Sequence, residues 1–363
     1  MIGTNAETLN LVPSQPYVVD PGLFFQMTSK TVSTPRQVPA PGSGLTAQAL
    51  QLPQVGIVSK IRINFVGTLT VGTAAVTTSD QWPYNLLRLF KLSVNGQNDL
   101  FSVGGIDLAV LRDVRYPSYV EATDVFPGSV GGGDTINVGT YTLFLTWEVP
   151  VAMDDYSLVG SLFAQSSATV ISVSVSQALN SELFSTNPAN ATIAGTFHIT
   201  PTTFEVPFDE RGQLVIPDLT KLHVLIAQDF PIGQVGETRV PLVRTSGALY
   251  RLFTSFRGSA TNRLSAAANA ASTKKLDAIR LEYAAGARRP YVFNPATLLL
   301  AQNNDHYGGI PMYDRLVFDF AKENPPRDLI LLAGVTELAV VPTVNAGVAV
   351  SGGTARIVQE TLV

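Results

Sequence analysis

Residues 84–96 read YNLLRLFKLSVNG and residues 274–286 read KKLDAIRLEYAAG, and each of these segments opens a series of patterns that the chain carries twice. Both are followed by a short pattern of helical spacing, GGIDLAVLRD from Gly104 and NPATLLLAQN from Asn294. An internal repeat identifies the unit from which a fold is built. We therefore predict that the two halves of the chain share one architecture.

Two further pairs of segments follow in the same order. TLFLTWEV at 142–149 matches DRLVFDFA at 314–321, and LFAQSSATVISVSV from Leu162 matches LLAGVTELAVVPTV from Leu331. Apolar residues alternate with polar ones in these segments, and a period of two buries one face of a β-strand. Duplicated β-modules without an accompanying catalytic motif indicate a structural building block.

Composition sets the broad class of the protein. A length of 363 residues corresponds to about two domains. Charged residues make up 14% of the chain, against an average of about 25%. A weakly charged surface fits a chain that packs against copies of itself, although it also fits an extracellular β-sandwich. The net charge of −4 gives no basic field for a nucleic acid backbone.

The absence of cysteine excludes a disulfide framework, a thiolate metal site and a cysteine nucleophile. The first residues, MIGTNAETLN, lack the basic stretch and apolar run of a secretory signal. No stretch approaches the roughly 18 consecutive apolar residues of a membrane-spanning helix. We therefore expect synthesis in a cytoplasm without export by a signal peptide.

The predicted fold class is all-β, with two tandem eight-stranded jelly-roll sandwiches, short loop helices and an extended N-terminal arm. Modules of about 150 residues exceed an immunoglobulin-type sandwich of about 100 and suit a jelly roll with long loops. Because proline is frequent before Gly44, we expect an arm there rather than a helix or internal strand. The predicted segments are an arm at 1–50, jelly rolls at 51–208 and 209–350, and a C-terminal arm at 351–363.

Five residues are candidate contacts between subunits. Leu23, Phe24 and Phe25 form an apolar cluster within the arm, which either folds back on its own domain or docks on a neighbouring subunit. Arg288 and Arg289 form a compact basic pair, which is either a solvated loop or a polar contact with a neighbour.

No catalytic, cofactor-binding or metal site is predicted, and we expect that the protein is not an enzyme. The three histidines, His198, His223 and His306, are far apart in the sequence. The adjacent pair Asp154-Asp155 is typical of a solvated turn. The run of glycines at 131–133 is not followed by the lysine and hydroxyl residue of a phosphate-binding loop.

The order of these weak motifs resembles that of the double jelly-roll major capsid proteins of tailless icosahedral viruses, especially the tectivirus-like phages. Residues 54–58, QVGIV, resemble the entry into the first sheet of that family, and residues 141–175 resemble the closing part of its first jelly roll. LVIPDLTKLHVLI at 214–226, followed by GALYRLFTSF at 247–256, resembles the opening of its second. The resemblance spans about residues 50–345.

The resemblance implies a structural role. Three subunits would form a capsomer of pseudo-sixfold outline, and such capsomers would tile an icosahedral virion shell. Each ring requires one surface patch to meet a different patch on the next copy. The implied partners are copies of the chain itself, together with penton proteins, minor capsid proteins or an internal membrane, without sequence-specific binding of nucleic acid. The implied location is the virion, after synthesis in the host cytoplasm.

One departure concerns the membrane. Family members that cover a membrane often begin with a basic helix, whereas the first basic residue here is Lys30 and the arm is rich in proline. The alternative function is a carbohydrate-binding β-sandwich of a spike or adhesin. Such sites expose aromatic residues on loops, but Trp82 and Trp147 lie in or beside strand patterns.

Overall fold

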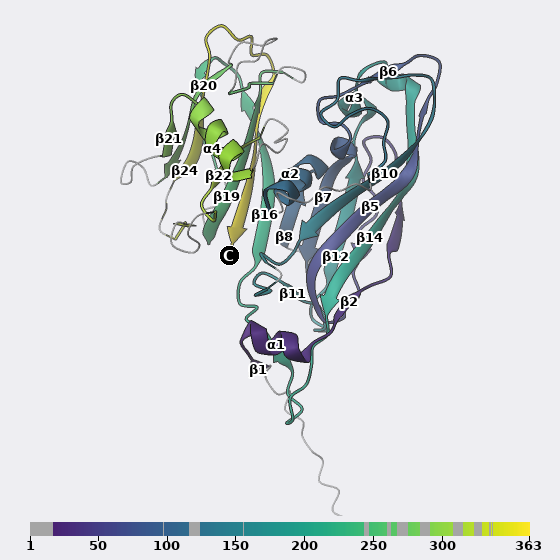
Figure 1. Cartoon of the computed structure of the whole chain (residues 1–363), viewed down its shortest axis with the longest axis vertical. Coiled ribbons are helices and arrows are strands. Elements are labelled where there is room, and N and C mark those ends of the chain that lie inside the picture. Colours follow the sequence, from purple (N-terminus) through teal and green to yellow (C-terminus); the bar gives the residue numbers. More distant parts are fainter. Residues whose placement is uncertain are drawn as a thin grey trace, which may run out of the picture.

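The structure is a computed structural model, shown in Figure 1. It describes residues 17–96, 98–115, 124–154, 156–242, 247–259, 263–266, 275–283, 291–307, 315–322, 329–333, 335 and 337–363.

The first half of the chain folds into a sandwich of two sheets. One sheet has the order β10-β5-β14-β2, with β3 also paired to β14, and the other has the order β4-β12-β7-β8. The strands are β2 (Lys30–Val32), β3 (Arg36–Pro39), β4 (Leu50–Gln51), β5 (Ile57–Val71), β7 (Leu87–Val94), β8 (Asn98–Val103), β10 (Gly139–Pro150), β12 (Ile171–Gln177) and β14 (Ala191–Phe204).

The second half folds into another sandwich. Its sheets have the orders β22-β19-β25-β16 and β17-β24-β20-β21, with β18 also paired to β24. The strands are β16 (His223–Ile232), β17 (Gly236–Glu237), β18 (Val240–Pro241), β19 (Ala248–Arg257), β20 (Leu276–Tyr283), β21 (Tyr291–Phe293), β22 (Leu316–Asp319), β24 (Leu338–Val344) and β25 (Gly353–Leu362).

The two sandwiches have the same topology. When the strands of each half are numbered along the chain, with β2/β3 and β17/β18 each taken as one, the sheets read 6-3-8-1 and 2-7-4-5 in both halves. A helix lies between the fifth and sixth strands of each: α2 (Gly105–Arg115) and α4 (Thr297–Tyr307). Two tandem eight-stranded jelly rolls are therefore confirmed, as is a helix in each repeat, although α4 begins after the Asn294-Pro295 pair that was predicted to start it.

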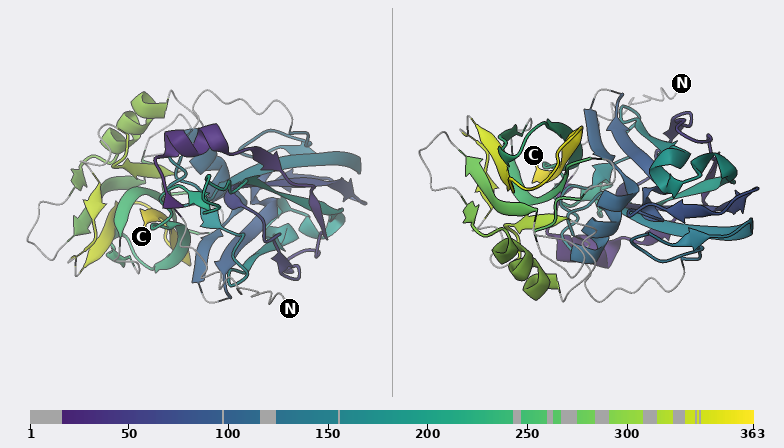
Figure 2. Two further views of the ribbon diagram at one scale, coloured as in Figure 1. Left: turned by 90° about the horizontal axis from the view of Figure 1, so that it is seen from below. Right: turned by 90° about the horizontal axis from the view of Figure 1, so that it is seen from above.

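The sandwiches lie side by side and share a sheet (Figures 1 and 2). Strand β8 of the first pairs in parallel with β16 of the second, with Phe101 opposite Leu225 and Ser102 opposite Ile226. Because these strands join one sheet of each sandwich, a single sheet runs from β22 to β4. One core lies around Phe65 and Trp147 in the first sandwich and extends to Val224 and Val358 of the second, and another lies around Leu281 in the second.

Several short elements elaborate the jelly rolls. Strands β6 (Val76–Thr78), β9 (Thr135–Ile136) and β13 (Phe184–Thr186) form a small sheet at one end of the first sandwich. Strand β1 (Tyr17–Val18) pairs in parallel with β15 (Val215–Ile216) at the opposite end, beside α1 (Pro21–Met27). The remaining elements are β11 (Leu162–Phe163), α3 (Asn180–Leu183), η1 (Tyr84–Leu86), η2 (Pro188–Asn190) and β23 (Ile330–Leu331).

The predicted C-terminal arm is wrong, and the described part of the predicted N-terminal arm contains a short helix and edge strands. Within 1–50, α1 forms with Pro21 in its first turn, and β2 and β3 pair with β14 as the first strand of the first jelly roll. Proline is tolerated in the first turn of a helix and at a sheet edge, and Pro39 ends the edge strand β3. The segment 351–363 contains β25, which pairs with β16 on one side and β19 on the other.

Candidate functional site

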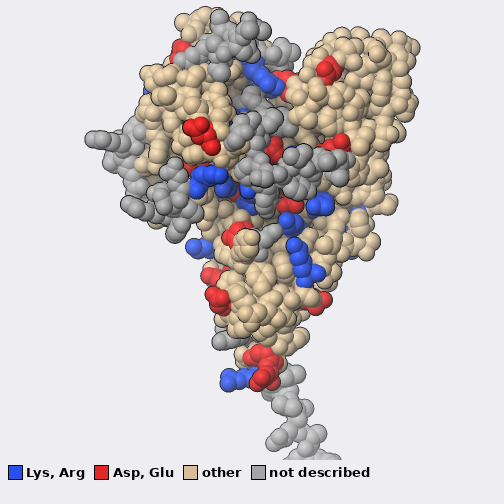
Figure 3. Space-filling view, in the orientation of Figure 1, with Lys and Arg blue, Asp and Glu red and all other residues tan. Residues whose placement is uncertain are grey.

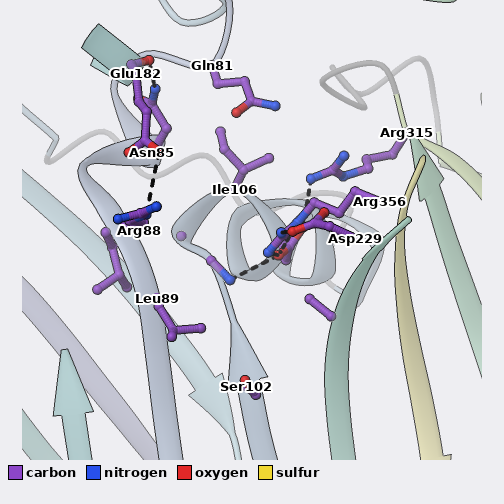
Figure 4. A pocket seen from close by; sticks show the side chains of 15 residues that line it. Gln81, Asn85, Arg88, Leu89, Ser102, Ile106, Glu182, Asp229, Arg315 and Arg356 are labelled. Carbon is purple, nitrogen blue, oxygen red and sulfur yellow. Dashed lines mark hydrogen bonds and ion pairs between the residues drawn. The ribbon is translucent and has the colours of Figure 1, made fainter. Parts of the chain in front are cut away.

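Helix α2 of the first sandwich packs beside β25 of the second, and a buried aspartate on the helix joins them. The carboxylate of Asp107 accepts a hydrogen bond from Arg315 Nη2 at 2.7 Å and one from Arg356 Nη2 at 2.6 Å. It also accepts one from the backbone N–H of Gly104 at 2.9 Å, which ties the start of the helix to its own side chain. Figure 4 shows Arg315 and Arg356 close together beside a pocket.

A second ion pair joins the far end of the same helix to the same strand. Arg115 Nη2 donates to Glu360 Oε1 at 2.5 Å, and Arg251 Nη1 on β19 donates to Glu360 Oε2 at 2.9 Å. The side chain of Glu360 has no exposed surface. Nε of Arg251 continues the network to Asp319 at 3.0 Å, and Asp319 also accepts from the hydroxyl of Tyr307.

The spacing of the two ion pairs matches the geometry of a helix beside a strand. Asp107 and Arg115 are eight residues apart, which spans about 12 Å along an α-helix. Arg356 and Glu360 are four residues apart, which spans about 13 Å along a strand. The helix and the strand therefore contact each other at both ends. The acidic residue comes first along the helix, and the basic residue comes first along the strand.

The surrounding charges keep the carboxylates of Asp107 and Glu360 ionised. Burial alone would raise the pKa of Asp107, but the charges of Arg356 and Arg315 outweigh it and lower the pKa to about 2. Burial would also raise the pKa of Glu360, but the charges of Arg251 and Arg115 hold this pKa well below its ordinary value. Nε2 of His223 lies 3.3 Å from Oε1 of Glu360. Burial lowers the pKa of this histidine, so it is neutral at pH 7.

The exposed charged side chains are unevenly distributed over the surface. On the face shown in Figure 3, the described lysine, arginine and acidic residues gather where the two sandwiches meet, and the upper part of the first sandwich is nearly uncharged. On this face, the described charged residues are therefore denser at the junction than on the upper part of the first sandwich.

Three of the predicted contact residues lie in α1. Phe24 is fully buried against its own chain, with its ring centroid 6.4 Å from that of Phe204, so this residue folds back on its own domain. Phe25 packs against the same ring at 5.4 Å and is half-buried. Leu23 is 47% exposed and points away from the core. The predicted contacts Arg288 and Arg289 lie outside the described residues, as does Asp155.

Sequence reasoning missed the residues of the ion network. In the helix it used only the spacing of apolar residues, and it assigned the tail that carries Arg356 and Glu360 to an arm. The available signal was Asp107 three residues after Gly104, a position from which an acidic side chain can cap the start of a helix.

Other possible sites are accounted for by packing. Both tryptophans of the chain, Trp82 and Trp147, are buried, so neither is exposed on a loop as a carbohydrate-binding surface would require. Among the described residues, no cluster of three or more histidine or acidic side chains is placed to hold a metal ion. Within the same part of the chain, every helix is too short or too polar to cross a lipid bilayer.

Comparison with known proteins places the fold. No protein-family model and no curated protein sequence matches the chain. Among solved structures, the STIV MCP has a TM-score of 0.67 at 19% identity, covering 92% of this chain and 97% of its own. The capsid of the PBCV-1 virus gives 0.59 at 13% identity, covering 92% and 93%. The major capsid protein of bacteriophage PM2 gives 0.52 at 11% identity, covering 92% and 98%. The chain therefore has the double jelly-roll fold of these capsid proteins.

Proposed function

We propose that this protein is a major capsid protein that forms an icosahedral virion shell. The observation that carries the proposal is the repetition of one eight-stranded topology in two sandwiches fused side by side. It is supported by solved capsid proteins that have this fold over nearly their whole length. The lowered pKa values of Asp107 and Glu360 arise in ion pairs that join the sandwiches, which supports a structural rather than a catalytic role for these two residues.

We further propose that three copies close a ring with a pseudo-sixfold outline. Two similar sandwiches in one chain give three chains six similar units, and a ring requires contacts between unlike patches. Interfaces of this obligate kind bury about 2,000 Å² or more. We propose that the contacts between subunits include Leu23 and Phe25 of α1, and also Arg288 and Arg289. Penton or minor capsid proteins would then occupy positions that the trimers leave open.

The mass of the purified protein tests this proposal. We expect sedimentation equilibrium to give three times 38.7 kDa, or about 116 kDa, and negative-stain images to show particles with a hexagonal outline. Particles with a round outline and no sixfold modulation would contradict the ring. A monomer at micromolar concentration that never assembles into shells would contradict the capsid function.

A further inference from the structure

The junction between the sandwiches contains a pocket of about 390 Å³. It lies where α2 begins and is lined from the first sandwich by Arg88, Ser102 and Gly105, and from the second by Ala227, Arg315 and Arg356. Figure 4 shows the labelled side chains around it, with the guanidinium group of Arg315 directed inward. The capsid function proposed above makes no use of this pocket.

The side chain of Arg315 is buried, and two of its nitrogen donors have no hydrogen-bond partner. Only 1% of it is exposed, and Nη2 is bonded to Asp107 at 2.7 Å. Nε and Nη1 are buried and have no hydrogen-bond partner. A buried donor without an acceptor costs about 1–3 kcal/mol, and more when the group is charged. An acceptor inside the pocket would remove this cost.

The carboxylates that line the pocket are already engaged. Asp107 accepts from Arg356 and Gly104 as well as from Arg315. Asp229 pairs with Arg356 Nη1 at 2.8 Å, and Glu182 accepts from the backbone N–H of Leu179 at 2.9 Å. The positive end of the α2 dipole also faces this region, because Gly104 and Gly105 line the pocket. The unpartnered N–H groups of Arg315 therefore lack a hydrogen-bond acceptor, and the positive end of the helix dipole favours an acceptor that is negatively charged.

We propose that this pocket binds a small oxyanion, a phosphate or a carboxylate, through the unpartnered N–H groups of Arg315. Charge-assisted hydrogen bonds from a guanidinium group to such anions are stronger than neutral ones. The site is built from both sandwiches, since α2 belongs to the first and Arg315 to the second. A bound anion thus stabilises the relative placement of the two halves before any contact between subunits forms.

Titration of the full chain with inorganic phosphate, and separately with acetate, tests the site. Chloride replaces either anion at constant ionic strength, and calorimetry and thermal unfolding report binding. Three variants are compared: Arg315→Gln removes the donors, Ala227→Leu fills the pocket and keeps the charges, and Arg280→Gln is the control. Arg280 lies on β20 and pairs with Glu237 at 2.6 Å, and it does not line the pocket.

We expect saturable binding of at least one anion, with a melting temperature that rises with its concentration. The dissociation constant should rise at least about tenfold in Arg315→Gln and in Ala227→Leu, and should not change in Arg280→Gln. Stronger binding of phosphate or of acetate identifies which oxyanion the site prefers. The absence of saturable binding, or equal affinity in the wild type and Ala227→Leu, overturns the proposal. If Arg315→Gln does not fold, the wild type and Ala227→Leu decide the question.

Discussion

Replacing Asp107 with asparagine tests the ion network that joins the two jelly rolls. The substitution keeps the size of the side chain but removes its charge. Arg315, of which 1% is exposed, and Arg356, of which 24% is exposed, would then face a neutral amide at the same position. Because a buried charge without a counter-charge is costly, we expect the variant to be much less stable at neutral pH.

Two independent arguments give the size of the effect. Breaking a buried ion pair by removing one partner costs about 3–5 kcal/mol. The pKa of Asp107 is about 2, against an ordinary value of 3.8. The difference corresponds to about 2 kcal/mol at about 1.4 kcal/mol per unit. Since the amide can still accept one hydrogen bond, we expect a loss of about 2–4 kcal/mol at pH 7.

The pH dependence has a definite sign. A carboxylate whose pKa is lowered by folding stabilises the protein above about pH 4, and this contribution disappears as the pH falls towards 2. The unfolding free energies of the wild type and of Asp107→Asn should therefore converge in acid. Urea unfolding between pH 7 and pH 2.5, at one fixed protein concentration, measures both curves.

The matched control is Asp99→Asn. Asp99 pairs with Lys91 at 3.1 Å in the same sandwich, but both side chains are more than 40% exposed. Exposed pairs contribute about 0–1 kcal/mol, so this variant should be close to the wild type. Equal losses in the two variants, or a loss below about 1 kcal/mol for Asp107→Asn, would refute the account of the network.

Three further changes test other parts of the fold by denaturant unfolding. Gly105→Ala should cost at least about 2 kcal/mol, because the new Cβ would lie 2.2 Å from a backbone oxygen and 2.6 Å from an indole nitrogen, whereas Gly233→Ala has open space and should be nearly neutral. Phe24→Ala should cost about 3–5 kcal/mol and speed proteolysis of α1, while Leu23→Ala should leave the monomer's stability unchanged and weaken the trimer. Glu360→Gln should cost about 3–5 kcal/mol, because two buried arginines lose their shared counter-charge.

The repeated architecture could be predicted from the sequence because apolar residues recur at every second position along several strands. Leu143, Leu145 and Trp147 alternate along β10 and face the first core, and Leu316 and Phe318 do the same along β22. Asn95 and Gly96, which stand between β7 and β8, have φ values of 55° and 66°, and the Asn-Gly pair is a sequence signal for such a turn. The apolar alternation and the turn residues agree in these segments, so the order of the strands can be predicted from the sequence.

Strand β25 shows why the tail was misassigned. Ala355 and Ile357 face the second core, and Val358 contacts the first. Arg356 and Glu360 have the polarity of a solvated face, although α2 covers that face. Burial by another part of the chain is a long-range fact, and nothing in the local pattern SGGTARIVQETLV distinguishes a covered ion pair from an exposed one. The same limit hid the role of Asp107.

The junction between the two sandwiches must fix their relative orientation as well as hold them together. The strand pairing that joins the sandwiches, between β8 and β16, extends over two residue pairs, and apolar residues of the second sandwich such as Val224, Phe253 and Val358 continue the first core across the junction. The ion pairs at the two ends of α2 act at points about 12 Å apart, and each requires narrow hydrogen-bond distances and angles. Two separated directional contacts fix a rotation that a short strand pairing does not. A shell built from repeated rings needs that angle to be the same in every copy, and apolar packing, which lacks direction, specifies it less well than paired charges do.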